Sequence, residues 1–224
     1  MKKKLLTGLV IGVFVVAWAV LAEANIIDAT YGIGAGSFEL GNFVNGGGNP
    51  EAAGPGYMGL LPGDMTITGW TVGGPGDGID WLLSPYWGAD SGIHAVDLQH
   101  LRPSSIATVI PTITGEVYRL SFSTSTYFNS TNSGVVSAGS LVNQLFSATP
   151  SFYSWQFTRY EFLFTAMGPT TRIEFMSFGP ETNYGPAIDS VSVDQAAPVP
   201  EPATMLLLGA GIAGLGAFRL VRKK

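Results

Sequence analysis

The chain has 224 residues and no cysteine, which excludes a disulfide-linked scaffold, a thiol nucleophile and a cysteine-ligated zinc site. Only 12% of the residues are charged and the formal net charge is −5, which argues against an electrostatic nucleic-acid binder. All five lysines and two of the six arginines lie near the termini. Residues 25–198 therefore hold four arginines against 14 carboxylates, a formal charge of −10.

Residues 1–24 have the three parts of a secretory signal peptide. A basic start is followed by an uncharged apolar run over residues 5–21, and Ala22 and Ala24 form an A-x-A cleavage site. We therefore expect export through the Sec translocon and cleavage by a signal peptidase before Asn25. The alternative is a retained membrane anchor, because the apolar run is nearly long enough to span a bilayer.

Residues 25–197 are expected to form one all-β domain, a sandwich or a barrel. Glycine and proline separate short runs of β-branched and aromatic residues, and no long stretch shows the apolar period of a helix. On one predicted strand Tyr118, Leu120 and Phe122 share a face. The polar run 121–140 is expected to be a loop between strands. The predicted strands cover residues 67–72, 79–83, 94–98, 106–110, 117–124, 135–142, 159–166, 171–177 and 188–193.

The C-terminal residues 198–224 form a tail in three parts. A motif comes first, then an apolar segment of about residues 203–221 that is expected to form a transmembrane helix, and a basic end at residues 219–224 that stays cytoplasmic. The motif residues are Val199, Pro200, Glu201, Pro202, Ala203 and Thr204.

This tail resembles the PEP-CTERM sorting signal of Gram-negative bacteria. The resemblance implies processing by an exosortase and delivery to the cell surface in organisms that make extracellular polysaccharide. The expected route is a transient inner-membrane intermediate, then the cell surface or the extracellular matrix. The alternative is a plain C-terminal anchor.

An ordered set of short segments runs through the middle of the chain: 36–39, 67–72, Ile79-Asp80-Trp81, Tyr86-Trp87, 95–98, 118–122 and 185–193. In order and spacing this set resembles the choice-of-anchor C domain, a relative of the DUF642 family. The resemblance implies a jelly-roll β-sandwich similar to galactose-binding domains and carbohydrate-binding modules. One departure is Ala107-Thr108, where the family usually has Gln-Thr.

Two carboxylates, Glu39 and Asp189, are candidate ligands of a structural Ca²⁺. Asp189 shares the strand parity of Val191 and Val193, which predicts an inward side chain, and a buried carboxylate needs a partner. Similar modules place such a pair around calcium, which takes six to eight oxygen ligands. Alternatively, both carboxylates accept backbone N–H groups at the ends of strands. A second acidic group has a weaker calcium-loop pattern, with solvated turns as its alternative; it comprises Asp77, Asp80, Asp90 and Asp97.

Aromatic residues between positions 57 and 87 suggest a glycan site, because sugar rings stack on exposed aromatic faces. Tyr86 and Trp87 follow Ser84-Pro85 in a predicted loop and are the candidate contacts, with Asp80, Asp90 and His94 beside them. Trp70 and Trp81 lie in predicted strands and are expected in the core instead.

No catalytic group stands out in the sequence. The chain has two histidines and lacks the Gly-x-Ser-x-Gly elbow of serine hydrolases. We therefore expect a surface protein that is not an enzyme and has a structural or carbohydrate-binding role with exopolysaccharide. The alternatives are a glycan-degrading enzyme that uses two of the carboxylates, and a protein–protein matrix component without sugar affinity.

Overall fold

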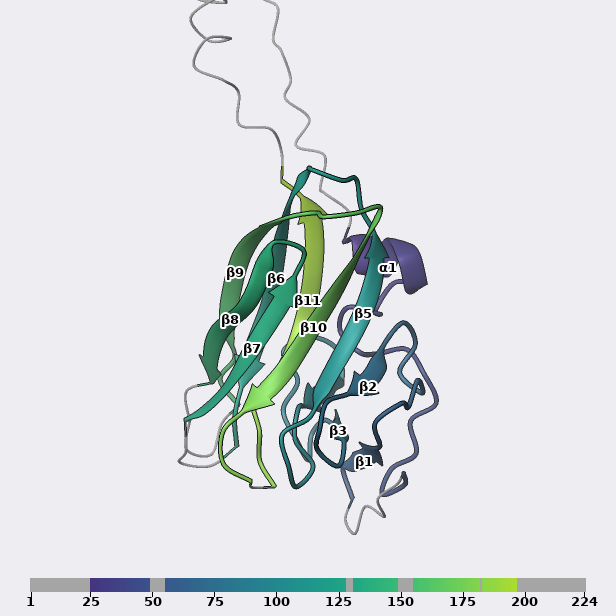
Figure 1. Ribbon diagram of the computed structural model, residues 1–224. Coiled ribbons are helices and arrows are strands. Elements are labelled where there is room, and N and C mark those ends of the chain that lie inside the picture. Colours follow the sequence, from purple (N-terminus) through teal and green to yellow (C-terminus); the bar gives the residue numbers. More distant parts are fainter. Residues whose placement is uncertain (1–24, 49–54, 128–130, 149–154, 182, 197–224) are drawn as a thin grey trace, which may run out of the picture.

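The computed structural model describes residues 25–48, 55–127, 131–148, 155–181 and 183–196. Within these ranges the chain forms eleven strands and one short helix, and the strands make two antiparallel sheets packed face to face (Figure 1). The predicted signal peptide, sorting motif and transmembrane helix lie outside the described residues. No helix in the described part of the chain is long and apolar enough to cross a bilayer.

The first sheet has six strands and the second has five. In spatial order the first sheet contains β1 (Tyr57–Leu60), β3 (Ile79–Leu83), β4 (His94–Asp97), β11 (Ala187–Gln195), β6 (Val117–Ser125) and β9 (Thr158–Thr165). The second contains β2 (Thr71–Gly73), β5 (Ser105–Pro111), β10 (Thr170–Phe178), β7 (Asn132–Ala138) and β8 (Leu141–Ala148).

The eight strands from β4 to β11 have the order of a jelly roll. They form two four-stranded sheets, β4-β11-β6-β9 and β5-β10-β7-β8, in which most consecutive strands belong to opposite sheets. Strands β3 and β1 extend the first sheet beyond β4, and β2 extends the second beyond β5. The predicted all-β jelly-roll sandwich is therefore confirmed.

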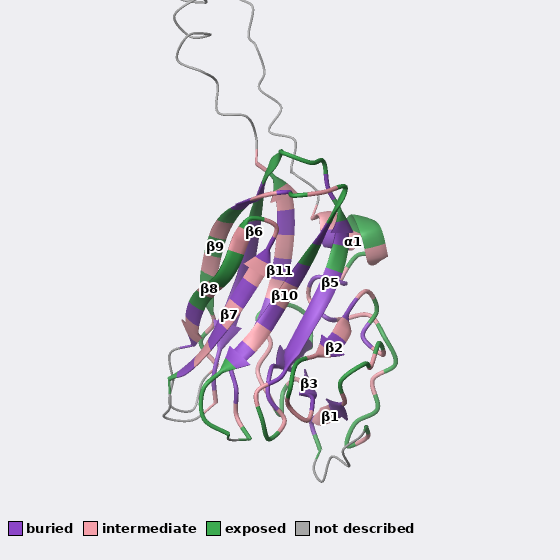
Figure 2. Cartoon of the chain, viewed as in Figure 1, coloured by how far each residue is buried: buried purple, intermediate pink, exposed green. Residues whose placement is uncertain are grey.

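The core lies between the two sheets and is rich in aromatic residues. Buried and more exposed residues alternate along β10, as expected for a strand with one face on the core (Figure 2). Phe122 on β6 packs against Phe146 and Phe175 from the second sheet, with ring centroids 5.0 and 4.9 Å apart. These inward aromatic side chains join the two sheets.

The two tryptophans predicted for the core are each 1% exposed. Their indole N–H groups donate to backbone carbonyls of the N-terminal segment. The Nε1 of Trp70 lies 2.8 Å from the carbonyl of Ala35, and that of Trp81 lies 3.1 Å from the carbonyl of Phe38. The segment before β1 is thus attached to the core through its backbone.

Three local predictions were wrong. The run 121–140 contains the end of β6 and all of β7, because small polar residues such as Ser133 and Ser137 alternate along β7 with the buried Gly134, Val136 and Ala138. Residues 135–142 belong to two strands, β7 and β8, that turn at Gly139, where φ is +52°. The strand expected at 67–72 shrinks to β2, because residues 67–70 form a turn in which the N–H of Trp70 donates to Ile67.

The helix α1 (Ile26–Tyr31) was not predicted. Its six residues are too few for an apolar period to be visible in the sequence. Asn25 caps it by accepting the N–H of Ile27, and the same side chain bonds Val191 and Val193 of β11. The start of the described chain is therefore fixed to the last strand.

Candidate functional site: a cleft on the outer face of the first sheet

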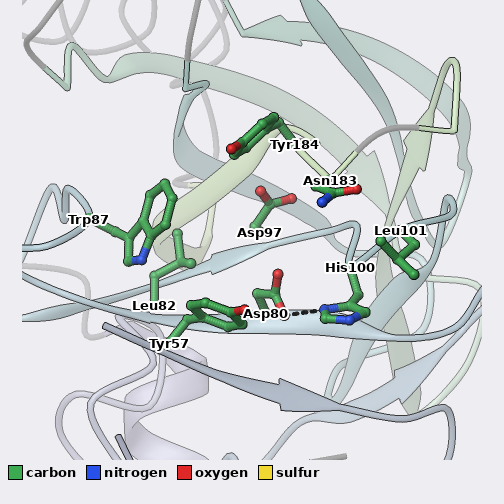
Figure 3. Close-up of a pocket in the computed structure, with 9 residues that line it drawn as sticks. All are labelled: Tyr57, Asp80, Leu82, Trp87, Asp97, His100, Leu101, Asn183 and Tyr184. Carbon is green, nitrogen blue, oxygen red and sulfur yellow. Dashed lines mark hydrogen bonds and ion pairs between the residues drawn. The ribbon is translucent and has the colours of Figure 1, made fainter. Parts of the chain in front are cut away.

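A cleft of about 240 Å³ opens on the face of the first sheet that points away from the core (Figure 3). Its floor consists of Asp80 and Leu82 on β3 and Asp97 on β4. Strand pairing places Asp80 directly opposite Asp97. The remaining lining residues are Tyr57, Trp87, His100, Leu101, Asn183 and Tyr184.

The two floor aspartates are almost buried and each has fixed partners. The Oδ1 atom of Asp80 lies 2.8 Å from Nδ1 of His100. Asp97 accepts the N–H groups of Gln99 and Gly185, at 3.0 and 2.9 Å. Gly185 approaches so closely that a Cβ atom there would lie 2.6 Å from the Asp97 carboxylate. Both carboxylates therefore have set orientations before any ligand arrives.

Burial and the charges of neighbouring groups change the pKa values of the two floor aspartates and of His100. Burial raises the pKa of Asp97 well above its ordinary value, and the neighbouring charge of Asp80 adds to the rise. The hydrogen bond that the Nδ1–H of His100 donates to Asp80 raises the pKa of His100, which favours the imidazolium form. Burial also raises the pKa of Asp80, so it favours the neutral form of both floor carboxyl groups. His100 is the one ionisable base among the residues that line the cleft.

Aromatic rings from three parts of the chain form the walls. The ring of Trp87 lies 6.4 Å from those of Tyr57 and Tyr184, measured between centroids. Behind it, Trp87 also contacts Tyr127 and Trp155, at 4.9 and 6.2 Å. A small apolar cluster beneath the rings contains Leu82, Ala95 and Ala187. The aromatic side chains of the wall are therefore held in place by packing against other side chains of the domain.

The loop between β3 and β4, residues 84–93, carries Trp87 over this face and is held by two distant carboxylates. Asp189 on β11 accepts the N–H groups of Asp90 and Ser91, at 2.6 and 2.9 Å. Glu39 accepts the N–H groups of Ile93 and His94, at 2.9 and 2.8 Å. The structure thus brings the two predicted calcium ligands to one loop.

Asp189 points to the outer face, so the parity prediction was wrong. Ile188 belongs to the main core, and Asp189 follows it on the opposite face. The register shifts between Asp189 and Ser192, and Ser190 adopts φ +52°, a β-bulge that returns Val191 to the core side. Burial raises the pKa of Asp189 to about 7.

The contacts of Glu39 and Asp189 do not fit a calcium ion. Both oxygens of Asp189 and one oxygen of Glu39 accept backbone N–H groups, whose positive ends would face the cation. Among the described residues no three acidic or histidine side chains gather in a metal-binding arrangement. The second acidic group gathers only in part. Asp80 faces Asp97, Asp77 accepts the N–H groups of Leu101 and Arg102, and Asp90 lies in the loop after β3. Calcium binding stays a prediction from the sequence.

The predicted glycan contacts divide in the structure. Asp80 and Trp87 line the cleft together. Tyr86 is 58% exposed and lies outside the lining, and Asp90 uses its backbone to hold the loop. His94 is buried, with its ring beside Trp81 and its Nδ1 2.8 Å from the carbonyl of Leu82.

Sequence reasoning missed most of the lining. It placed Asp97 in an acidic group but did not pair it with Asp80, because the pairing depends on the register of two strands. Tyr57 belonged to the aromatic stretch that suggested a glycan site, but Asn183 and Tyr184 are far from Trp87 in sequence, and only the fold brings them to it. One local pattern could have pointed to this lining: Tyr184 stands directly before Gly185 and just ahead of a predicted strand, a place where a loop can present an aromatic ring.

Comparison with known families assigns the domain. The profile of the family described as protein of unknown function DUF642 matches residues 36–194, so the chain belongs to the DUF642 family. The PEP-CTERM protein-sorting motif matches residues 198–223. This motif implies an exported protein that is processed by an exosortase. No curated protein matches the chain.

Several solved structures are similar at low identity. TmCBM61, solved with β-1,4-galactotriose, is 16% identical with a TM-score of 0.42, over 57% of this chain and 88% of that one. The family 22 carbohydrate-binding module of Clostridium thermocellum Xyn10B is 15% identical with a TM-score of 0.43, over 58% and 88%. A cyclase from Fischerella sp. is 13% identical with a TM-score of 0.45, over 73% and 94%. These likenesses do not indicate which ligand this chain binds.

Proposed function

We propose that this protein is a non-catalytic glycan-binding component of the cell surface, and that the cleft described above is its binding site. The carrying observation is the combination of aromatic walls with a polar floor of fixed orientation. Partly exposed rings of Tyr57, Trp87 and Tyr184 supply faces for stacking on a sugar. Asp80 and Asp97 supply acceptors for hydroxyl groups. Preset side chains lose little entropy on binding.

The route to the surface follows from the two ends of the chain. We propose that a signal peptide over residues 1–24 is removed, that the helix near residues 203–221 holds the protein briefly in the inner membrane, and that an exosortase then processes the tail. The match to the sorting motif supports this route. Association with exopolysaccharide belongs to the same proposal.

The position of the cleft suits a protein held by its C-terminus. Strand β11 begins at Ala187, which pairs with Asp97 of the cleft floor, and runs about 25 Å to Gln195. The sorting tail follows that far end. A chain anchored through the tail would present the cleft away from the membrane.

Glycan binding is tested with the full-length chain purified in detergent and applied to a glycan array. Retention of an oligosaccharide without released product supports the proposal. Release of shortened product would replace it by the glycan-degrading alternative, and a blank array would favour a matrix component that contacts proteins.

The sorting route has a separate test. Mass spectrometry of surface material should find a C-terminus that lacks Lys224, because the exosortase removes the basic end. An intact Lys224 in that material would contradict processing without bearing on glycan binding.

A further inference from the structure

We propose that the cleft selects glycans with a free amino group, that is, 2-amino-2-deoxyhexoses in their ammonium form, over neutral, N-acetylated and acidic sugars. This inference rests on the proposed glycan-binding function and names the class of sugar. It is argued from the two opposed carboxyl groups of the floor and the chemistry of the walls.

The floor offers acceptors for a cation. Asp80 and Asp97 lie opposite each other on neighbouring strands, and His100 is the one basic side chain among the residues that line the cleft. His100 bonds one oxygen of Asp80, which leaves the other oxygen of that carboxylate for a ligand. An ammonium group carries three donors and no acceptor, which matches two carboxylates better than a hydroxyl group does. A bound cation also favours the ionised carboxylates and so opposes the burial that raises the pKa of Asp97.

The walls offer a second kind of attraction for the same charge. The π faces of tyrosine and tryptophan attract ammonium groups within about 6 Å of the ring. In Figure 3 Asp97 lies between Tyr184 and Asp80, Tyr57 lies next to Asp80, and Trp87 closes the side beyond Leu82. A pyranose can therefore stack on a ring while its amino group reaches the carboxylates.

The same arrangement disfavours the other sugars. A uronic acid or sulfated sugar would bring negative charge to two buried carboxylates. The domain's arginines do not compensate, because three of the four pair with carboxylates of their own: Arg102 with Asp77, Arg159 with Glu161 and Arg172 with Glu174. N-acetylation removes the positive charge and adds a bulky group, so an N-acetylated sugar loses the attraction both to the carboxylates and to the aromatic rings.

The test compares three β-1,4-linked trisaccharides that differ at one substituent: the trimers of glucosamine, N-acetylglucosamine and glucose. Isothermal titration of the full-length chain in detergent is done at several pH values, because the amines must be protonated while Asp80 and Asp97 stay ionised, which their burial opposes. We expect the glucosamine trimer to bind at least about tenfold more tightly than the other two, which corresponds to about 1.4 kcal/mol. The preference should shrink as salt is added.

Two matched variants test whether the preference for the glucosamine trimer arises in the cleft. Asp80→Asn keeps the shape of the side chain and should reduce the preference to about threefold or less. Glu161→Gln removes one carboxylate from β9 of the same sheet, outside the cleft, and should leave it unchanged.

The outcomes separate the two proposals. Equal or tighter binding of the neutral trimer overturns the amino-sugar preference and leaves glycan binding intact. A preference that survives Asp80→Asn and disappears in Glu161→Gln overturns the assignment to this cleft. Absence of binding by any of the three trimers, together with a blank array, overturns both.

Discussion

The carboxylate of Asp189 accepts the backbone N–H of Asp90 at 2.6 Å, and this bond joins the last strand to the loop that carries Trp87. The two residues are 99 positions apart in the sequence. Asp189 was expected to bind a metal ion, but in the structure it binds the backbone of the loop that positions Trp87 at the cleft.

Replacing Asp189 should loosen that loop. Asp189→Ala leaves the N–H groups of Asp90 and Ser91 without their acceptor, so the free energy of unfolding should fall by about 1–3 kcal/mol. Glycan affinity should fall as well, because Trp87 loses its fixed position. Denaturant unfolding and titration measure the two effects. Gln195→Ala, at the exposed end of the same strand, should change neither, and full affinity in Asp189→Ala would disprove the positioning role.

Ionisation of Asp189 should make the folded state less stable as pH rises. Its pKa is raised from 3.8 to about 7 on folding, so the folded state binds the proton more tightly than the unfolded chain. The stabilisation from this proton is present below about pH 4 and is lost between about pH 4 and 7. Unfolding measured across that range should show a slope that weakens in Asp189→Asn. An unchanged slope in the variant would assign it to other groups.

Calcium should leave the protein unchanged if Glu39 and Asp189 keep their N–H partners. Titrating Ca²⁺ into chelator-treated protein should give no heat, and the melting temperature should stay the same. A rise in melting temperature that Asp189→Asn abolishes would instead show that the cation displaces the N–H groups and that the sequence prediction holds.

His100 should titrate above its ordinary pKa of 6.5, because Asp80 accepts its Nδ1 proton. The resulting stabilisation is complete below pH 6.5 and is lost as pH rises through the folded-state pKa. NMR titration of the His100 ring measures this value directly. Asp80→Asn should lower it, and an unchanged pKa in that variant would argue against the pair in solution.

Trp87→Ala should weaken glycan binding by about tenfold or more, since aromatic anchors in a site supply a large share of the binding energy. Tyr86→Ala is the matched control, because Tyr86 is the adjacent loop residue and lies outside the lining. Titration with the array-selected oligosaccharide gives both affinities. An equal loss in Tyr86→Ala would extend the binding surface beyond the cleft, as the sequence predicted.

The sequence by itself determined the fold class, the DUF642 membership and the sorting tail. Alternation such as Tyr118, Leu120 and Phe122 identified strands because the period of two is a local property of the backbone. The uneven distribution of basic residues likewise separated the two ends from a domain of formal charge −10.

Only the tertiary structure decided the site. Whether Asp80 faces Asp97 depends on strand register, and whether Tyr57 and Tyr184 reach Trp87 depends on how distant loops meet over one face. The bulge after Asp189 reversed the face that parity had predicted for that residue, because one extra residue in a strand exchanges inward and outward positions. These are relations between distant segments, and no local pattern encodes them.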